Sequence, residues 1–465
     1  MSYSTRILMI ALFCLSLISC GVDPHYKPEN PVNIPDAWRA THTHVKYAKV
    51  TPACIAWWHQ FNDPVLNHLI YTGLEHNNDL HVAMANVEAA QGELKRIKLN
   101  WIPSLSAALG YSSFPYLGYP GVLATIIPTY TLNIFTQIKE QQRAKYELKI
   151  TQNMRDTVKL AVIAQVSASY FRLMAETEQL NLLLQVDRDL TAQVNIFQST
   201  YQSGLTSNIT HVTKESTLSI IKASEEVIKR NKVVNQNMIQ YLLDENPEHF
   251  ILKRHFRALD PYRAEVSLLP LTVLENRPDM IQAIHELRAT NAGIGIAASH
   301  FLPTIQLSAA RGDIATIPNG STLGMPVYFN QALIGMPLIT FTTLGDVAKA
   351  RGLHKASYYR YLNTFRKVLR EVDTDLSAHD FYQQRFDKAV HAERHRREVY
   401  QLNKALYQQG IISYAELLDE KIKWDKIRIL VNQHKLDVLL VIVRLYQDLA
   451  LGYGCLHQGG IHGSA

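Results

Sequence analysis

Residues 103–111 read PSLSAALGY, and a related stretch, residues 303–309, reads PTIQLSA. In both stretches, larger apolar side chains alternate with small or polar ones after an initial proline. Alternation with a period of two predicts β-strands that have one apolar face. Segments rich in Pro and Gly follow at residues 114–121 and 318–326, as expected for the turns of two hairpins.

The returning strand of each hairpin is less regular. Residues 129–134 alternate threonine and asparagine with tyrosine, leucine and isoleucine, whereas Gly335 and Pro337 interrupt the corresponding stretch of the second hairpin. We predict strands near residues 103–113, 125–136, 303–314 and 327–341.

A long helix is predicted after each hairpin. Residues 139–200 contain neither Pro nor Gly, and their apolar residues recur at helical spacing. A helix of about sixty residues extends roughly 90 Å, so it needs neighbouring helices along its whole length. Each long helix is expected to end at a glycine, Gly204 or Gly410, and to be followed by another helix. The predicted long helices span residues 139–203, 206–244, 345–409 and 412–452.

The chain reads as two copies of one unit. Residues 79–83 align with residues 279–283, and beyond the hairpins residues 201–204 align with residues 407–410. Matches in a constant order indicate an internal duplication. Each copy opens with a shorter predicted helix, near residues 64–100 and 270–300. We assign repeat 1 to residues 63–262 and repeat 2 to residues 263–452.

The N-terminus has the pattern of an export signal. Arg6 precedes an apolar run, residues 7–18, that is too short to cross a bilayer as a helix. The run leads into LISCG (residues 17–21), which resembles a bacterial lipobox with Cys20 as the acylated residue. A buried N-terminal helix is the alternative interpretation. We predict a lipoprotein signal peptide over residues 1–19, an acylated extended segment over residues 20–62 and a tail over residues 453–465.

Composition and cysteine usage narrow the class of protein. The chain has 47% hydrophobic and 19% charged residues, typical of an ordered protein, and a net charge of +6. Its Lys and Arg residues form no basic block, so we expect no nucleic-acid partner. Of the four cysteines, Cys14 would leave with the signal. Cys54 and Cys455 could form a disulfide, although we favour two free thiols.

A sheet of four strands has two outer edges whose backbone N–H and C=O groups lack partners within one chain. In hydrocarbon, each unpaired backbone N–H or C=O group costs several kcal/mol, so strands that span a membrane must form a closed barrel. Barrels have at least about eight strands, so a four-stranded chain must assemble, two copies giving eight strands and three giving twelve. The alternative is a soluble periplasmic protein with an ordinary sheet, which leaves the very long helices without neighbours.

Five short motifs are similar to those of the TolC-like outer-membrane factors, in particular the NodT-type efflux lipoproteins. They are WWHQFNDP (57–64), NDL (78–80), WIPSL (101–105), RPD (277–279) and FLP (301–303). The segment that follows Cys20 is similar as well, and Gly21 is typical of sorting to the outer membrane. The resemblance covers nearly the whole mature chain in order.

This resemblance implies a mixed α+β membrane protein. It would be a homotrimer with a twelve-stranded outer-membrane β-barrel, continuous with a long periplasmic α-helical barrel that terminal segments surround. Such trimers dock onto a periplasmic adaptor protein and an inner-membrane RND-type pump. They are passive exit ducts for drugs or other small toxic compounds, so we expect neither enzymatic activity nor a cofactor. The alternatives are an exit duct for type I protein secretion and a structural or adhesive lipoprotein.

The resemblance also implies positions for adaptor docking and for a family motif. Gly204 and Gly410, with Ser207 and Ser413, would form the helix-turn-helix tips at the periplasmic end. Arg277, Pro278 and Asp279 form the motif of the second repeat.

A periplasmic aperture is expected near the second tip. The resemblance implies an aperture carboxylate at Asp419, with Ala415 and Ile422 beside it, where the family commonly has a larger apolar residue and a basic one. Three like charges around a narrow axis would favour cation entry and would need counter-charges to stay close together. The alternative is that Asp419 is an ordinary solvent-exposed residue of the helix.

One further pattern could hold a metal. His391 and His395 lie four residues apart, a spacing that can bind zinc. Three arginines crowd this segment, so we interpret it as an exposed helix face and predict no metal site.

Overall fold

The computed structural model describes residues 54–116, 119–247, 255–261, 270–316, 323–337 and 340–454. The predicted signal peptide, Cys20 and Cys455 lie outside these ranges.

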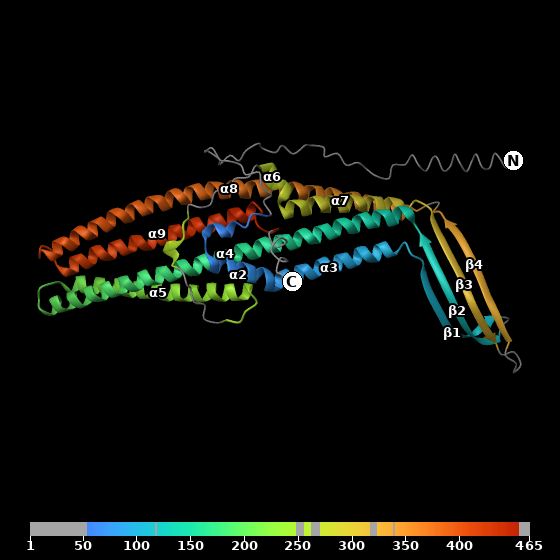
Figure 1. Cartoon of the computed structure of the whole chain (residues 1–465), viewed down its shortest axis with the longest axis horizontal. Coiled ribbons are helices and arrows are strands. Elements are labelled where there is room, and N and C mark those ends of the chain that lie inside the picture. The colour runs from blue at the N-terminus through green and yellow to red at the C-terminus, as the bar shows by residue number, and fades with distance from the viewer. Residues whose placement is uncertain are drawn as a thin grey trace, which may run out of the picture. The chain divides into compact units, whose positions relative to one another are not determined.

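The two halves of the chain contain the same succession of elements (Figure 1). After a short 3-10 helix, η2 (Trp57–Phe61), the first half comprises α2 (Pro64–His76), α3 (Asn78–Leu99), β1 (Ser104–Tyr116), β2 (Tyr119–Leu132), α4 (Ile134–Gln202) and α5 (Asn208–Leu242). After a second one, η3 (Phe256–Ala258), the second half comprises α6 (Pro270–Asn276), α7 (Pro278–Ser299), β3 (Thr304–Thr316), β4 (Leu323–Gly335), α8 (Phe341–Gln408) and α9 (Tyr414–Asp448).

Equivalent helices have nearly equal lengths. Helices α3 and α7 have 22 residues each, α4 and α8 have 69 and 68, and α5 and α9 have 35 each. Left-handed backbone recurs at equivalent positions, with φ +57° at Asp244 and +56° at Ala450. The duplication therefore extends to the geometry of the helix ends.

Several predicted boundaries were wrong. The helix predicted over 64–100 is interrupted at Asn77, which has an extended backbone (ψ 123°), and the one predicted over 270–300 is interrupted before Pro278. The hairpin turns are shorter than predicted, because β1 runs to Tyr116 and β2 begins at Tyr119 within the stretch 114–121, and β4 begins at Leu323 within the stretch 318–326. The returning strands also end earlier than predicted. The Asn133 Oδ1 accepts the Thr136 N–H at 3.1 Å and so caps α4, while β4 ends at Gly335, two residues before a proline that cannot donate to a ladder.

The four strands form one antiparallel sheet in the order β1-β2-β3-β4 (Figure 1). In the described part of the chain, β1 pairs only with β2 and β4 only with β3. The register brings apolar side chains from all four strands onto one face, and these remain exposed to between 42% and 81%: Leu105, Leu109, Tyr111, Val122, Ile126, Leu307, Tyr328 and Ile334. Arg311 and Asp313 of β3 lie on this same face. The opposite face carries small and polar residues such as Ser104, Ser106 and Gln306, together with Phe329 and Leu333 of β4.

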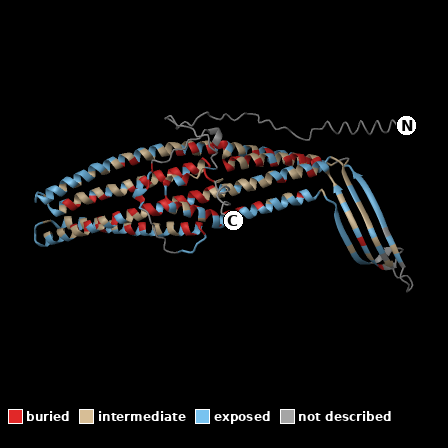
Figure 2. Ribbon diagram, viewed as in Figure 1, coloured by how far each residue is buried: buried red, intermediate tan, exposed pale blue. Residues whose placement is uncertain are grey.

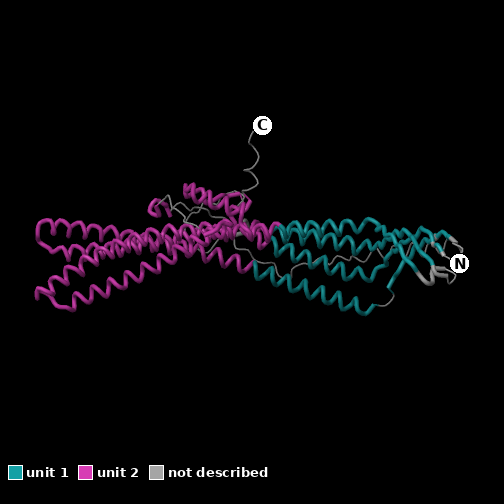
Figure 3. Tube along the Cα trace, turned by 90° about the horizontal axis from the view of Figure 1, so that it is seen from below, with its two compact units in different colours: residues 1–33, 85–153, 281–364 teal, residues 34–84, 154–280, 365–465 magenta. Residues whose placement is uncertain are grey.

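Two compact units cut across the two repeats (Figure 3). Among the described residues, unit 1 comprises residues 85–153 and 281–364, including the whole sheet, and unit 2 comprises residues 54–84, 154–280 and 365–454 within their described parts. Each unit draws on both copies because α4 and α8 run through both units. The repeats predicted over 63–262 and 263–452 are thus units of sequence and not separate folding domains.

The core of unit 2 forms where the WWHQFNDP motif meets the helices (Figure 2). Trp57 and Trp58 are each 1% exposed, and the Trp57 ring lies 5.0 Å from the ring of Tyr446. Asp63 caps α2 and accepts a hydrogen bond from the Tyr170 hydroxyl at 3.0 Å. A stretch of α4 is long and apolar enough to cross a membrane, but 67% of it is buried within the chain.

Gly452 should tolerate no side chain. Its φ is +93°, and a Cβ would lie 2.6 Å from the Trp58 ring and 3.2 Å from the Ile55 carbonyl oxygen. We expect Gly452→Ala to lower the free energy of unfolding by about 1–3 kcal/mol, through strain and overpacking. Denaturant titration of the purified protein measures this.

Gly92 provides the matched control. It lies in α3, and a Cβ there would meet nothing within 4 Å. Gly92→Ala should be neutral or stabilising, by up to about 1 kcal/mol. Equal effects of the two substitutions would contradict the assignment of Gly452 to the Trp58 contact.

Candidate functional site

The two helix-turn-helix corners of unit 2 share one geometry. Gly204 and Gly410 follow α4 and α8 with φ of +72° and +76°. At each corner the glycine N–H donates to the carbonyl three residues earlier and the next N–H to the carbonyl five residues earlier, over 2.8–3.0 Å. This is a Schellman motif, which satisfies carbonyls that the helix end leaves unpaired. A Cβ at either glycine would meet nothing within 4 Å, so the positive φ alone favours glycine.

Serines begin the helix that follows each corner. The Ser207 hydroxyl oxygen accepts the Ile209 N–H at 3.2 Å, and the Ser413 hydroxyl oxygen accepts the Glu416 N–H at 3.2 Å. Glu416 in turn accepts the Ser413 N–H at 2.8 Å, which completes a capping box and lowers the pKa of the Glu416 carboxyl. All four predicted tip residues therefore lie at the corners and shape them.

Asp419 lies between two lysines. Its Oδ1 accepts from Lys214 Nζ on α5 at 2.8 Å, and its Oδ2 lies 2.8 Å from Lys423 Nζ on α9. Burial opposes ionisation of the carboxyl, but the hydrogen bonds from Lys214 and Lys423 outweigh it and lower the pKa of Asp419 to about 2. The counter-charges expected around an aperture carboxylate are thus supplied by its own chain.

Ala415 and Ile422 differ in their surroundings. The Ala415 carbonyl oxygen accepts from Gln193 Nε2 of α4 at 2.8 Å, and its side chain is half-buried. Ile422 is 4% exposed and packs with Val186, Leu190 and Leu218 from α4 and α5. Because its side chain fills the interior of its own chain, we leave Ile422 out of the proposed aperture.

The Arg277-Pro278-Asp279 motif forms a buried network of ion pairs and hydrogen bonds. Arg277 is 7% exposed and makes two hydrogen bonds to the Asp279 carboxylate, at 2.9 and 2.8 Å. It also donates to Glu371 Oε2 of α8 at 3.1 Å and to the carbonyl oxygen of Asp448, the last residue of α9, at 3.0 Å. Pro278 opens α7. Burial alone would lower the pKa of Arg277, but the hydrogen bonds and charges of these carboxylates raise it. The motif therefore ties α7, α8 and α9 together.

In the first repeat, the residue equivalent to Arg277 is Asn77, an uncharged side chain that also donates to the last carbonyl of a long helix. Asn77 Nδ2 donates to the carbonyl oxygen of Leu242, the last residue of α5, at 3.0 Å. Asn77 corresponds to Arg277 in the duplication, and Leu242 corresponds to Asp448. Among the described residues, only the second repeat has an ionic network at this contact.

A carboxyl pair extends this network, and the sequence analysis did not find it. Asp375 is 2% exposed and lies 3.3 Å from Arg444 Nε. Burial, then a hydrogen bond with Asp448 and its charge, raise the pKa of Asp375 to about 7, and burial also raises that of Asp448. Asp375 is therefore protonated up to about neutral pH. The sequence pattern that could have indicated these buried carboxyls is the pair Glu371 and Asp375, which lie four residues apart beside an apolar helical stripe.

Other candidates bring no ligands together. His391 and His395 are exposed on α8, and among the described residues no group of three or more His, Cys, Asp or Glu side chains could hold a metal ion. Cys54 is an exposed free thiol. Because Cys455 lies outside the described residues, a pairing of the two cysteines stays an open alternative.

Comparison with protein families gives one match over most of the chain. The model described as "Outer membrane efflux protein" matches residues 69–220 and 269–451. The chain is 24% identical to the probable efflux pump outer membrane protein TtgC of Pseudomonas putida, over 98% of this chain and 96% of the relative. It is also 24% identical to the outer membrane protein OprJ of Pseudomonas aeruginosa, over 88% of each.

Solved structures share the fold. The open state of the MtrE outer membrane channel of Neisseria gonorrhoeae matches with a TM-score of 0.81 and 21% identity, over 93% of this chain and 98% of that one. The outer-membrane channel OprN matches with a TM-score of 0.76 and 20% identity, over 94% of this chain and 100% of that one.

Removing the central guanidinium should destabilise the chain strongly. Arg277→Ala leaves Asp279 without its counter-charge and leaves Glu371 with only the 3.7 Å pair to Lys367, so we expect a loss of about 3–5 kcal/mol in the free energy of unfolding. Denaturant titration measures it. Arg96→Ala, which breaks an exposed pair with Glu93, should cost at most about 1 kcal/mol. Similar losses in the free energy of unfolding for both variants would show that the buried ion pairs of Arg277 stabilise the chain no more than an exposed pair does.

The carboxyl pair should make stability depend on pH. The pKa of Asp375 is about 7 in the folded chain, above the value of about 3.9 for an unperturbed aspartate. Between these values the folded state binds more protons than the unfolded state, so the stability that this pair contributes falls as pH rises from about 4 to about 7. Asp375→Asn mimics the protonated acid and should remove this slope from profiles of unfolding midpoint against pH. Parallel profiles of wild type and variant would contradict the raised pKa of Asp375.

Proposed function

This chain is an outer-membrane efflux channel that belongs to the outer membrane efflux protein family, and we propose that it acts as a homotrimer, a passive exit duct for small toxic compounds. The relatives include proteins named as toluene and solvent efflux pump outer membrane proteins. Their names support apolar small molecules as the class of cargo.

The sheet is the observation that carries the proposal. Its apolar face is exposed, with Leu109 81% and Tyr328 74% accessible, and β1 and β4 each have one edge without a partner in the described chain. Lipid would accommodate the apolar face, but it makes open edges costly because nothing there can hydrogen-bond to the backbone. Closure with other copies pairs these edges, and three copies give a twelve-stranded barrel. The acyl group proposed on Cys20 would add an anchor to the outer membrane.

The corners at Gly204 and Gly410 are the proposed docking positions for a periplasmic adaptor, which would link the duct to an inner-membrane RND-type pump. Ser207 and Ser413 support this by holding both corners in one defined conformation. In a trimer, six such corners would repeat around the axis and present a regular ring to the adaptor.

We assign the closed aperture to Asp419 and the lysines beside it. Three copies would bring three carboxylates toward the axis, where their mutual repulsion would favour opening. Lys214 and Lys423, both 2.8 Å from the carboxylate, offset that repulsion and so permit a closed state. Lys214 lies on α5 and Asp419 on α9, so the ion pair also joins the helices that follow the two corners.

Asp419→Ala should raise single-channel conductance in planar bilayers, because it removes the ion pair to Lys214 and loosens the contact between α5 and α9. Glu398→Ala, which removes an exposed carboxylate of α8, should leave conductance unchanged. Equal conductance of Asp419→Ala and wild type would remove Asp419 from the gate.

Two experiments test the function itself. Crosslinking on purified outer membranes should give a trimer band. A strain that lacks the protein should become hypersensitive to dyes, detergents or antibiotics. Loss of a secreted protein without hypersensitivity would instead support a type I secretion duct, and neither effect would support a structural role.

A further inference from the structure

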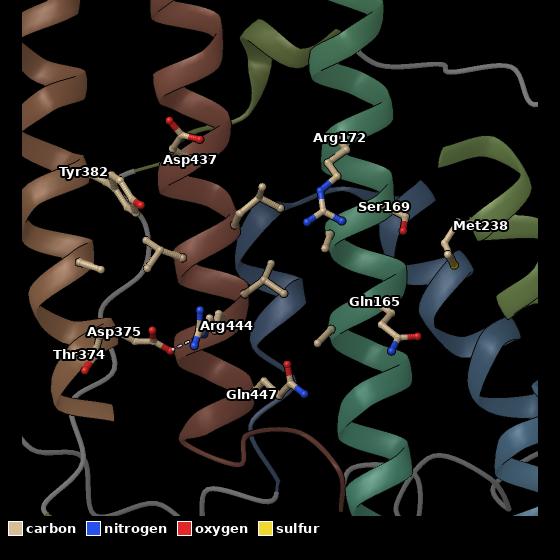
Figure 4. A pocket seen from close by; sticks show the side chains of 16 residues that line it. Gln165, Ser169, Arg172, Met238, Thr374, Asp375, Tyr382, Asp437, Arg444 and Gln447 are labelled. Carbon is tan, nitrogen blue, oxygen red and sulfur yellow. Dashed lines mark ion pairs between the residues drawn. The ribbon is translucent and has the colours of Figure 1, made fainter. Parts of the chain in front are cut away.

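A groove of about 780 Å³ lies on unit 2 between α4, α8 and α9 (Figure 4). Apolar side chains of Ala164, Leu440 and Val441 line part of it, together with Met238 of α5. Gln165, Ser169 and Gln447 add polar groups. Its volume is within the range of small-molecule sites, which combine apolar walls with a few polar groups.

The groove lies on the face of the helices opposite to the connecting segments. On α9, Lys435 donates to the carbonyl oxygen of Phe256 in η3 at 3.0 Å, and Tyr446 packs against Trp57 of η2. Asp437 and Arg444 line the groove, and at 100° per residue they project from the other side of α9. On α4, Phe171 packs against Phe61 with ring centroids 5.0 Å apart, while residues 164, 165, 168, 169 and 172 line the groove.

In the proposed duct, this arrangement would place the groove on the lumenal side. If η2 and η3 lay inside a barrel of helices, they would obstruct the passage that an exit duct needs. They therefore belong on the outer surface, and the groove on the opposite face belongs to the lumen.

Some charged side chains in the groove have an ionic partner within the described chain and Arg172 has none. Asp375 pairs with Arg444 at 3.3 Å, and Asp437 pairs with Arg385. Arg172 takes part in no ion pair within the described part of the chain, and Figure 4 shows its side chain extending from α4 toward α9. Burial raises the pKa of Glu176, one turn further along α4, against a hydrogen bond from Asn235 and the charge of Arg172. The groove thus offers a cation whose charge its own carboxylates do not neutralise.

We propose that this groove is a lumenal binding site for amphiphilic anions, with the sulfonate or carboxylate head on Arg172 and the apolar body against Ala164, Leu440 and Val441. The site rests on the proposed duct, because it needs the groove to face an open lumen. It would retain anionic cargo briefly on its way out, and it names a substrate class that the fold alone does not.

Naphthalene-2-sulfonate, which is water-soluble and forms no micelles, is the probe. Calorimetric titration of the purified full-length protein in nanodiscs should detect its binding. Arg172→Gln should weaken binding at least about tenfold, the usual effect of losing one charge-assisted hydrogen bond. Arg143→Gln is the matched control, since Arg143 is an exposed arginine of the same helix outside the groove, where it pairs with Glu147. It should bind like the wild type, and Arg172→Lys should retain part of the affinity.

Three results would each contradict the proposed binding site. Absence of binding to the wild type, equal binding to Arg172→Gln, or equally tight binding of the naphthyl trimethylammonium cation would each overturn the site. Single-channel conductance, recorded on the same preparations, separates this from failure of the duct. A channel that conducts but binds no sulfonate refutes only the groove, whereas a protein that forms no channel refutes the proposed function.

Discussion

The chain cannot satisfy both the face and the edges of its β1–β4 sheet by itself, and the remaining architecture depends on this constraint. The apolar face formed by Leu105, Leu109, Tyr328 and Ile334 is exposed, so water is an unfavourable solvent for it. Hydrocarbon suits the face but leaves the outer N–H and C=O groups of β1 and β4 without partners. The proposed pairing with further copies would resolve both conflicts together. The long helices then continue from the ends of β2 and β4 with one residue or a few residues between.

Duplication gave the chain two copies of one backbone, but the side chains at equivalent positions have diverged. Asn77 and Arg277 both donate to the last carbonyl of a long helix, at 3.0 Å in each repeat. Only Arg277 also gathers Asp279 and Glu371. The neutral contact costs little desolvation, whereas the ionic one holds more helices together at the expense of burying charge. Equivalent backbone positions therefore do not carry equivalent electrostatics.

Two carboxyl groups in the helical part interact with charged or acidic partners from other helices. Asp419 is held between two lysines, and Asp375 has a pKa of about 7 because of burial and the neighbouring Asp448. Both arrangements keep carboxylates in partly or fully buried positions that would otherwise be unfavourable. Arg172 stands apart because it faces the groove without an ion pair in the described chain, which is why its position suggests a ligand from outside.

The sequence by itself determined the order of elements, the duplication and the two glycine corners, because periodicity and turn chemistry are local properties of neighbouring residues. Membership of a channel family came from the resemblance of short motifs and from the family match. It misplaced the ends of the returning strands, since the cap formed by Asn133 competes with the alternation that continues through residue 134. Tertiary structure alone decided that Ile422 is interior, that Asp419 is neutralised by Lys214 from 205 residues away, and that Asp375 meets Asp448. Such contacts join residues far apart in the chain, and no local pattern specifies which charged side chains packing will bring within hydrogen-bonding distance.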